Sequence, residues 1–186
     1  LKKKESHIYL LGPIVHNKQL IEKMEREGAT LISDGKEAAN DPKAKVLIRA
    51  HGLPAKGYEA LEQQNIAYID ATCPFVKKIH NIVDKHHREG YDIIIIGDRN
   101  HPEVIGINGW CGDGAYIAKD QQELVQLLQK YEKLTKNRVC IVAQTTINRE
   151  NFEKCLDILN KLCTNPVIFD TICNATNERQ KEAKQL

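Results

Sequence analysis

Short apolar runs that alternate with helix-like segments constrain this chain more than any other feature. The runs "YDIIIIG" (residues 91–97) and "RVCIVA" (residues 138–143) are apolar at nearly every position. A strand with one face in water alternates apolar and polar residues, whereas a parallel strand covered by helices on both faces does not. The sequence therefore predicts an α/β fold built on parallel sheets.

The expected elements follow from these runs and from helix-end signals. Strands are expected at residues 7–11, 45–50, 67–71, 91–97, 114–118, 138–143 and 166–170. Helices are expected at residues 17–27, 55–64, 74–89, 102–108, 120–130 and 148–163, and the polar segment after residue 173 is also helical in composition. Pro74 suits the first turn of a helix, and Gly28 and Gly90 suit helix ends. Asp120 with Glu123 is typical of a capping box.

One short motif occurs twice, each time where a predicted strand meets a predicted helix. "AYIDATCP" (residues 67–74) carries Asp70 and Cys73, and "VIFDTICN" (residues 167–174) carries Asp170 and Cys173. The two copies indicate an internal repeat of about 100 residues. We therefore expect one complete α/β lobe flanked by two partial ones. The expected bounds are residues 1–73, 74–170 and 171–186.

Polar residues suited to chemistry follow the predicted strands. In an open parallel sheet, ligands bind outside the carboxyl ends of the strands, so these residues are expected to gather at one edge. They are His16, His51, Cys73, His101, Glu103, Thr145, Thr146 and Cys173. Their types suit ligation, proton transfer and anion binding.

The six cysteines divide by context. Cys73 and Cys173 stand at strand-to-helix turns, where the positive end of a helix favours the thiolate that binds metal or attacks as a nucleophile. A structural zinc site would need four ligands at closer spacing, and two cysteines are too few for an iron–sulfur cluster unless a third comes from outside the chain. Cys140, Cys155 and Cys163 are expected in the core, and Cys111 in an exposed turn. His80, His86 and His87 are expected on or near the polar side of the helix after Cys73.

Composition excludes some classes of protein. The chain has 27 basic and 25 acidic residues, a net charge of +2, and no basic cluster. We therefore expect neither a nucleic-acid-binding nor a membrane-binding surface. The longest aliphatic run, "IIII", is far shorter than the roughly 20 apolar residues of a spanning helix, and no signal peptide is visible, so a soluble cytoplasmic protein is expected. The single methionine is Met24, so the chain is expected to be a piece of a longer protein.

Six motifs, in this order and spacing, resemble the 4-hydroxy-3-methylbut-2-enyl diphosphate reductase family. They are "GPIVHN", "AHG", "DATCP", "NHPEV", "QTT" and "DTIC". The resemblance implies a pseudo-threefold trefoil of α/β lobes around a [4Fe–4S] cluster held by one cysteine from each lobe. Cys73 and Cys173 match two of these ligands. The third belongs to an N-terminal motif that this chain lacks, and the family's Ser-Ser-x-Asn segment would lie beyond Leu186.

The resemblance also implies roles for the remaining site residues. His16 and His51 would contact the diphosphate of an allylic substrate, and His101 would belong to the same cage. Glu103 would supply protons, with Thr145 bridging it to the substrate hydroxyl. The partner would be an electron donor such as ferredoxin or flavodoxin, the products would be isopentenyl and dimethylallyl diphosphate, and the piece alone is expected to be inactive.

Two other classes of function stay open from the residues alone. The first is a non-catalytic α/β module that binds a small anion, although the chain lacks a Walker loop and a G-x-G-x-x-G motif. The second is a thiol-based redox protein, although the chain lacks a C-x-x-C motif. Iron and sulfide content separates both from the reductase.

Overall fold

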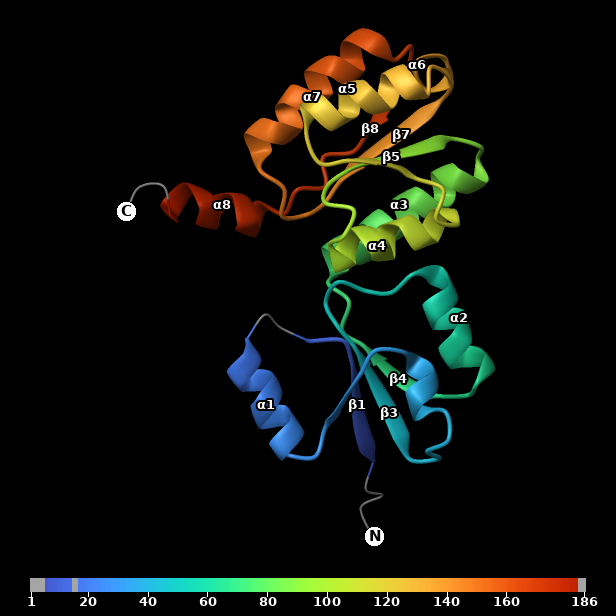
Figure 1. The fold of residues 1–186 in the computed structure, drawn as a ribbon, viewed down its shortest axis with the longest axis vertical. Coiled ribbons are helices and arrows are strands. Elements are labelled where there is room, and N and C mark those ends of the chain that lie inside the picture. Colours follow the sequence, from blue (N-terminus) through green and yellow to red (C-terminus); the bar gives the residue numbers. More distant parts are fainter. Residues whose placement is uncertain (1–5, 15–16, 184–186) are drawn as a thin grey trace. The chain divides into compact units, whose positions relative to one another are not determined.

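The computed structural model describes residues 6–14 and 17–183 of the chain. The chain divides into two compact units, Leu1–Pro74 and Phe75–Leu186, each with its own sheet (Figure 1). No helix of the described ranges is long and apolar enough to cross a membrane.

The first unit is a four-stranded parallel sheet between helices. Its strands are β1 (His7–Leu11), β2 (Thr30–Ile32), β3 (Ala44–Ile48) and β4 (Ala67–Asp70), in the order β2-β1-β3-β4. Its helices are α1 (Lys18–Arg26), the short 3₁₀ helix η1 (Gly35–Ala38) and α2 (Ala55–Gln63). Helices α1 and α2 lie on opposite sides of the sheet (Figure 1).

The second unit repeats this architecture. Its strands are β5 (Asp92–Ile96), β6 (Tyr116–Ala118), β7 (Val139–Ala143) and β8 (Val167–Ile168), all parallel, in the order β6-β5-β7-β8. Its helices are α3 (Pro74–Arg88), α4 (Pro102–Asn108), η2 (Gly109–Cys111), α5 (Gln121–Lys130), α6 (Lys133–Lys136), α7 (Arg149–Leu162) and α8 (Asn174–Ala183). In both units the second strand lies at one edge and the fourth at the other.

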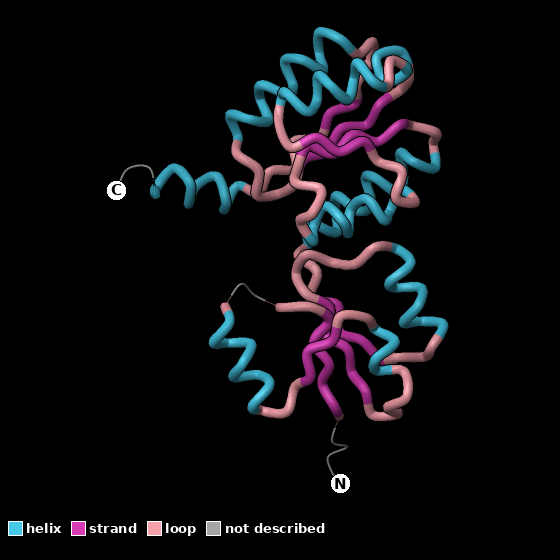
Figure 2. Tube along the Cα trace, in the orientation of Figure 1, coloured by secondary structure: helices cyan, strands magenta, loops and turns pink. Residues whose placement is uncertain are grey.

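The central strand of the second unit is buried on both faces, which explains its run of isoleucines. One face of β5 packs in a core cluster with α5 and α7, and the other packs with α3 and α4. Figure 2 shows the strands of this unit as a layer between helices. The buried members of the two clusters include Ile94, Ile96, Leu124 and Phe152 on the first face and Ile79, Ile93, Ile95 and Val104 on the second. Each isoleucine buried in this way contributes about 1.5–3 kcal/mol.

The predicted α/β class with parallel sheets is confirmed. Helix α3 begins at Pro74, and the side chain of Asp120 caps α5 by accepting from the amides of Gln122 and Glu123, as the sequence indicated. Strand β2 was not predicted. It is an edge strand of three residues with one buried side chain, which is too short to show an alternation of apolar and polar residues. The lobe bounds after residues 73 and 170 stay a prediction.

Two histidines of α3 are buried, so their predicted place on its polar side is wrong. His80 is 2% exposed and stacks on Trp110, with ring centroids 5.2 Å apart. His86 is 9% exposed, donates from Nδ1 to the Ile82 carbonyl at 2.7 Å, and packs edge-on against Tyr91. Both imidazole rings pack against aromatic side chains in the core, which periodicity on a hydropathy scale does not reveal.

Candidate functional site

The carboxyl ends of β5 and β7 bring a buried carboxylate and a threonine into contact. Glu103 is 2% exposed and Thr145 is 6% exposed. The Thr145 amide donates to Glu103 Oε1 at 2.6 Å, and the Thr145 hydroxyl donates to Glu103 Oε2 at 2.7 Å. Both carboxylate oxygens thus have a donor, which is what a buried acidic group requires.

Helix α4 places Glu103 through its own cap. His101 is the N-cap residue, and its Nδ1 accepts from the Glu103 amide at 3.2 Å, while Pro102 fills the first helical position. A ring that accepts at Nδ1 carries its proton on Nε2 when neutral, so it can donate from that atom. The sequence "HPE" therefore fixes the imidazole and the carboxylate in one helical turn.

Gln144 and Gly97 are two residues of this region that the sequence analysis did not single out. Gln144 Oε1 accepts from the Asp98 amide at 3.0 Å, and its Nε2 donates to the Thr146 hydroxyl at 2.8 Å. The amide side chain thereby ties the loop after β5 to the loop after β7. A Cβ at Gly97 would lie 2.8 Å from the Cβ of Gln144, so the two loops approach closely only because Gly97 has no side chain. In the sequence, the only sign of this contact was that a glutamine precedes the two threonines of "QTT".

Cys73 lies in a tightly bonded turn at the end of β4. Asp70 Oδ1 accepts from the Thr72 amide at 2.9 Å, and the Thr72 hydroxyl also bonds to this oxygen. The Tyr58 hydroxyl lies 2.9 Å from the Thr72 hydroxyl. The Cys73 amide donates to the Ala50 carbonyl at 2.9 Å, next to the end of β3.

Cys173 lies in the corresponding turn after β8. Asp170 Oδ1 accepts from the Ile172 amide at 3.3 Å, and Arg149 Nη1 lies 2.5 Å from Asp170 Oδ2. The Cys173 amide donates to the Thr145 carbonyl at 2.9 Å, next to the end of β7. The backbone of Thr145 thus joins the turn that carries Cys173 to the Glu103 carboxylate.

The four other cysteines are core residues. Burial raises the pKa of Cys111 and of Cys155 to about 11 and that of Cys140 to about 12, and it also raises the pKa of Cys163. Each therefore stays a neutral thiol at neutral pH. The predicted core positions of Cys140, Cys155 and Cys163 are confirmed.

Cys111 is not the exposed thiol that its glycine-rich surroundings indicated. Its side chain is 2% exposed, and Sγ donates to the Asn108 carbonyl at 3.2 Å. The short helix η2 turns the residue inward before Gly112 (φ +65°) lets the chain reverse. Only Cys73 and Cys173 keep partly exposed thiols.

The remaining predicted site residues are histidines of the first unit. His51 is partly buried in the turn after β3, where the Gly52 amide donates to the Arg49 carbonyl at 3.0 Å. His16 lies outside the described residues.

The thiols fit an iron–sulfur cluster in kind. Clusters are held by cysteine thiolates, and the two partly exposed thiols both follow the last strand of a sheet. Within residues 6–14 and 17–183, no group of three or more histidine, cysteine or acidic side chains could hold a metal ion.

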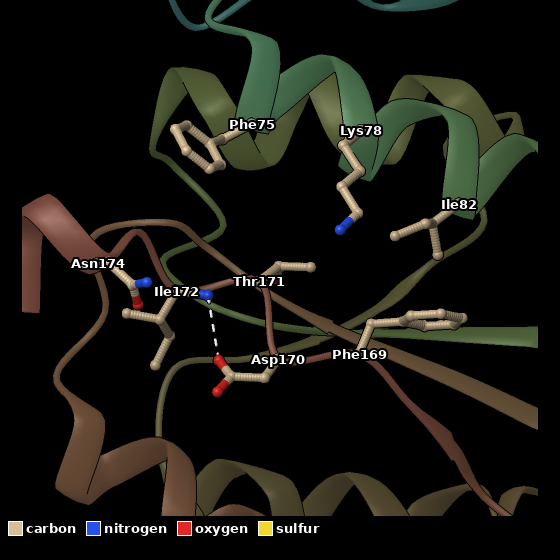
Figure 3. Close-up of a pocket in the computed structure, with 8 residues that line it drawn as sticks. All are labelled: Phe75, Lys78, Ile82, Phe169, Asp170, Thr171, Ile172 and Asn174. Carbon is tan, nitrogen blue, oxygen red and sulfur yellow. Dashed lines mark hydrogen bonds between the residues drawn. The ribbon is translucent and has the colours of Figure 1, made fainter.

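A shallow pocket lies beside the turn of Cys173. It has a volume of about 210 Å³ and is lined by Phe75, Lys78 and Ile82 of α3 and by Phe169, Asp170, Thr171, Ile172 and Asn174 (Figure 3). The amine of Lys78 points into it from α3 (Figure 3). Glu103 and Thr145 do not line this pocket, so it is separate from the carboxylate pair.

The chain is similar to proteins of one family, both in sequence and in structure. The family model described as LytB protein matches residues 1–186. The 4-hydroxy-3-methylbut-2-enyl diphosphate reductase of Caldanaerobacter subterraneus subsp. tengcongensis is 43% identical over 185 residues, which cover 100% of this chain and 62% of that protein. The reductase of the same name from Clostridioides difficile is 43% identical over 189 residues, covering 100% of this chain and 64% of its own length.

Solved structures agree. A structure of (E)-4-hydroxy-3-methyl-but-2-enyl diphosphate reductase matches with a TM-score of 0.79 and 37% identity, covering 100% of this chain and 64% of that one. The E-1-hydroxy-2-methyl-but-2-enyl-4-diphosphate reductase from Plasmodium falciparum matches with a TM-score of 0.83 and 29% identity, covering 98% and 56%. The chain thus spans 62% and 64% of the two curated relatives named above. The resemblance stated from the motifs is confirmed, and the chain belongs to the LytB protein family.

Proposed function

We propose that the natural protein carrying these residues removes the hydroxyl group of 4-hydroxy-3-methylbut-2-enyl diphosphate by reduction. The products would be isopentenyl and dimethylallyl diphosphate, in the deoxyxylulose phosphate route of the cytoplasm. The observation that carries the proposal is the buried Glu103–Thr145 pair at the carboxyl ends of two parallel strands. Its support is the naming of the relatives as reductases of this substrate.

The reaction needs two electrons and two protons. The allylic C–O bond breaks, one proton leaves with the hydroxyl as water, and the other is added to the carbon skeleton. The position of that addition decides which isomer forms. An acid close to the leaving oxygen lowers the barrier because hydroxide is a poor leaving group.

We assign the acid to Glu103 and the relay to Thr145. The Thr145 hydroxyl lies 2.7 Å from Glu103 Oε2, within proton-transfer reach. When Glu103 is protonated on Oε2 this bond reverses, so that the carboxyl group donates to the Thr145 hydroxyl and the hydroxyl donates its own proton to the substrate oxygen. The Thr145 amide, 2.6 Å from the other carboxylate oxygen, keeps Glu103 oriented during the exchange.

We further propose that Cys73 and Cys173 hold two iron corners of a [4Fe–4S] cluster. Their partial exposure supports this assignment, because the other four thiols are buried. When bound, such a cluster supplies electrons and an open iron that acts as a Lewis acid. A ferredoxin or flavodoxin would deliver the electrons.

The diphosphate is assigned to His16, His51 and His101. Imidazole N–H groups suit phosphate oxygens, and they gain charge when the ring is protonated. For His101, the acceptor role of Nδ1 at the cap of α4 leaves Nε2 as the donor atom of the neutral ring.

Anaerobic purification of the complete natural protein tests the proposal. Iron, sulfide and conversion of the diphosphate substrate are measured for the natural protein, for Glu103→Gln and for Glu153→Gln, which alters an exposed carboxylate of α7. We expect Glu103→Gln to keep iron and sulfide but lose at least about 10²-fold in turnover, with Glu153→Gln unchanged. Unchanged turnover in Glu103→Gln would remove it from the proton path. Iron-free protein that binds anions tightly would instead favour the non-catalytic module.

A further inference from the structure

The two Asp-x-x-Cys turns are supported from the same place in each unit, but by different chemistry. In both units, the helix between the third and fourth strands sends one side chain to the aspartate that opens the turn. This helix is α2 in the first unit and α7 in the second. Tyr58 is the fourth residue of α2 and Arg149 is the first residue of α7, so corresponding helices support the two turns from different positions.

The support of the first turn is a set of uncharged hydroxyls around one carboxylate. The Tyr58 hydroxyl lies 2.9 Å from the Thr72 hydroxyl and 3.4 Å from Asp70 Oδ1. Thr72 is 4% exposed, and its amide and hydroxyl both bond to Asp70. Tyr58 and Asp70 are partly buried, and the two hydroxyls carry no charge, so salt has no ion pair to screen in this network.

The support of the second turn is an ion pair at the surface. Arg149 is the first residue of α7, and its Nη1 lies 2.5 Å from Asp170 Oδ2, with the two side chains 29% and 54% exposed. Asp170 uses its other oxygen for the Ile172 amide. An exposed ion pair contributes about 0–1 kcal/mol, and salt screens it.

We infer that Tyr58 and Arg149 are positioning residues for the thiols of Cys73 and Cys173, the first by a salt-insensitive hydroxyl network and the second by a salt-sensitive ion pair. The inference rests on the proposed function only in taking the two thiols as cluster ligands. Residues around ligating side chains fix their orientation and tune affinity, commonly by 10–100-fold.

The geometry explains how each residue acts through the aspartate. In each turn, one oxygen of the aspartate accepts from the amide two residues later, that of Thr72 or Ile172. The amide of the following cysteine donates at 2.9 Å to a carbonyl just after the neighbouring strand. Releasing the aspartate loosens the turn and the cysteine amide together. The effect is local, because each set of contacts stays within its own unit.

Amide hydrogen exchange of the chain tests the positioning directly. The variants are Arg149→Gln and Tyr58→Phe, with Arg149→Lys as the conservative rescue. Lys154→Gln is the matched control, because it breaks a 2.7 Å pair with Glu150 on the same helix without touching Asp170. We expect Arg149→Gln to speed exchange at the Cys173 amide about fivefold and to leave exchange at the Cys73 amide unchanged. Tyr58→Phe should speed exchange at the Cys73 amide and leave the Cys173 amide unchanged. Arg149→Lys should restore most of the protection of the Cys173 amide.

Salt separates the two kinds of support. Raising NaCl from about 0.05 M to about 1 M should speed exchange at Cys173 in the natural sequence, and it should have no such effect in Arg149→Gln, where the pair is already absent. Exchange at Cys73 should not respond to salt. An equal salt response at both cysteine amides, or unchanged Cys173 exchange in Arg149→Gln, would overturn the inference.

Iron and sulfide content and the reduction potential of the complete natural protein test the link to the cluster. We expect Arg149→Gln to lose bound iron several-fold faster under a chelator and to shift the potential, with Lys154→Gln unchanged. If the natural protein binds no iron, the proposed cofactor fails, and the exchange pattern still decides whether Tyr58 and Arg149 position the turns. If it binds iron and neither retention nor potential changes in Arg149→Gln, the positioning role toward the cluster is wrong.

Discussion

Thr145 donates twice to Glu103, from its amide at 2.6 Å and from its hydroxyl at 2.7 Å. The same residue accepts, at its carbonyl, the Cys173 amide at 2.9 Å. One residue at the end of β7 therefore contacts both the proposed proton donor and the turn of a proposed cluster ligand. Because the amide and the carbonyl of Thr145 belong to the backbone, a substitution can remove the hydroxyl contact and keep the two backbone contacts.

Thr145→Val tests the relay while keeping the backbone bonds. Valine has nearly the same shape and no hydroxyl, so one donor to Glu103 is lost and the amide donor is retained. We expect turnover of the complete natural protein to fall about 10²-fold with little loss of iron. The free energy of unfolding, measured by urea titration of the chain, should fall by about 1–3 kcal/mol.

Thr145→Ser is the control, because it returns the hydroxyl. Serine at this position should recover most of the turnover. Equal turnover in the valine and serine variants would show that the hydroxyl carries no proton.

Cys73→Ser and Cys173→Ser should each impair assembly of the cluster. A serine hydroxyl is a far poorer iron ligand than a thiolate, so visible absorbance and iron content should both fall strongly. Cys155→Ala, which changes a fully buried thiol of α7, serves as the matched control and should keep its iron. Full iron content in either serine variant would contradict the ligand assignment.

Much of the fold was predictable because buried segments carry a recognisable pattern of apolar residues. The residues Ile93 to Ile96 lie between two cores, and this double burial is what a continuous apolar strand indicates. The start of α3 was predictable from Pro74, because proline suits only the first turn of a helix. Strand β2 was missed, since its three residues carry one buried side chain.

The site was less predictable, because its residues meet through topology. Glu103 and Thr145 are 42 positions apart and belong to neighbouring strand ends, so the rule for parallel sheets brought them to one edge but not into contact. Arg149 was not singled out from the sequence, because its bond joins the start of α7 to Asp170, 21 positions further along the chain. His80 and His86 were misplaced because a hydropathy pattern does not anticipate ring stacking in the core.

The chain should lose stability in alkali because its buried thiols resist ionisation. Burial raises the pKa of Cys140 from its ordinary value of 9.0 to about 12. Above pH 9 the thiol ionises in the unfolded chain but stays neutral in the folded one, so the folded state binds more protons and its stability falls as pH rises. The Cys140 thiol contributes a slope of about 1.4 kcal/mol per pH unit between these values.

The contribution of Cys140 is isolated by comparison with Cys140→Ala. Urea titrations at pH 8, 9.5 and 10.5 give the free energy of unfolding of both chains. The alanine variant should be less stable at pH 8 because of the cavity, and its stability should fall less steeply with pH. Parallel pH profiles would mean that Cys140 ionises equally in the folded and unfolded states.

Gly97→Ala should disturb the site by crowding rather than by losing a contact. The new Cβ would lie 2.8 Å from Gln144 Cβ, which the backbone fixes, and 2.9 Å from Val104 Cγ2, which belongs to a fully buried side chain. Overpacking of this kind costs about 1–3 kcal/mol, which urea titration would detect. Because Gln144 ties the loops that carry His101 and Thr145, turnover should also fall, more steeply than the loss of folded protein explains. A variant as stable and as active as the natural protein would show that the two loops can separate freely, and that their close approach is not required to hold Glu103 against Thr145.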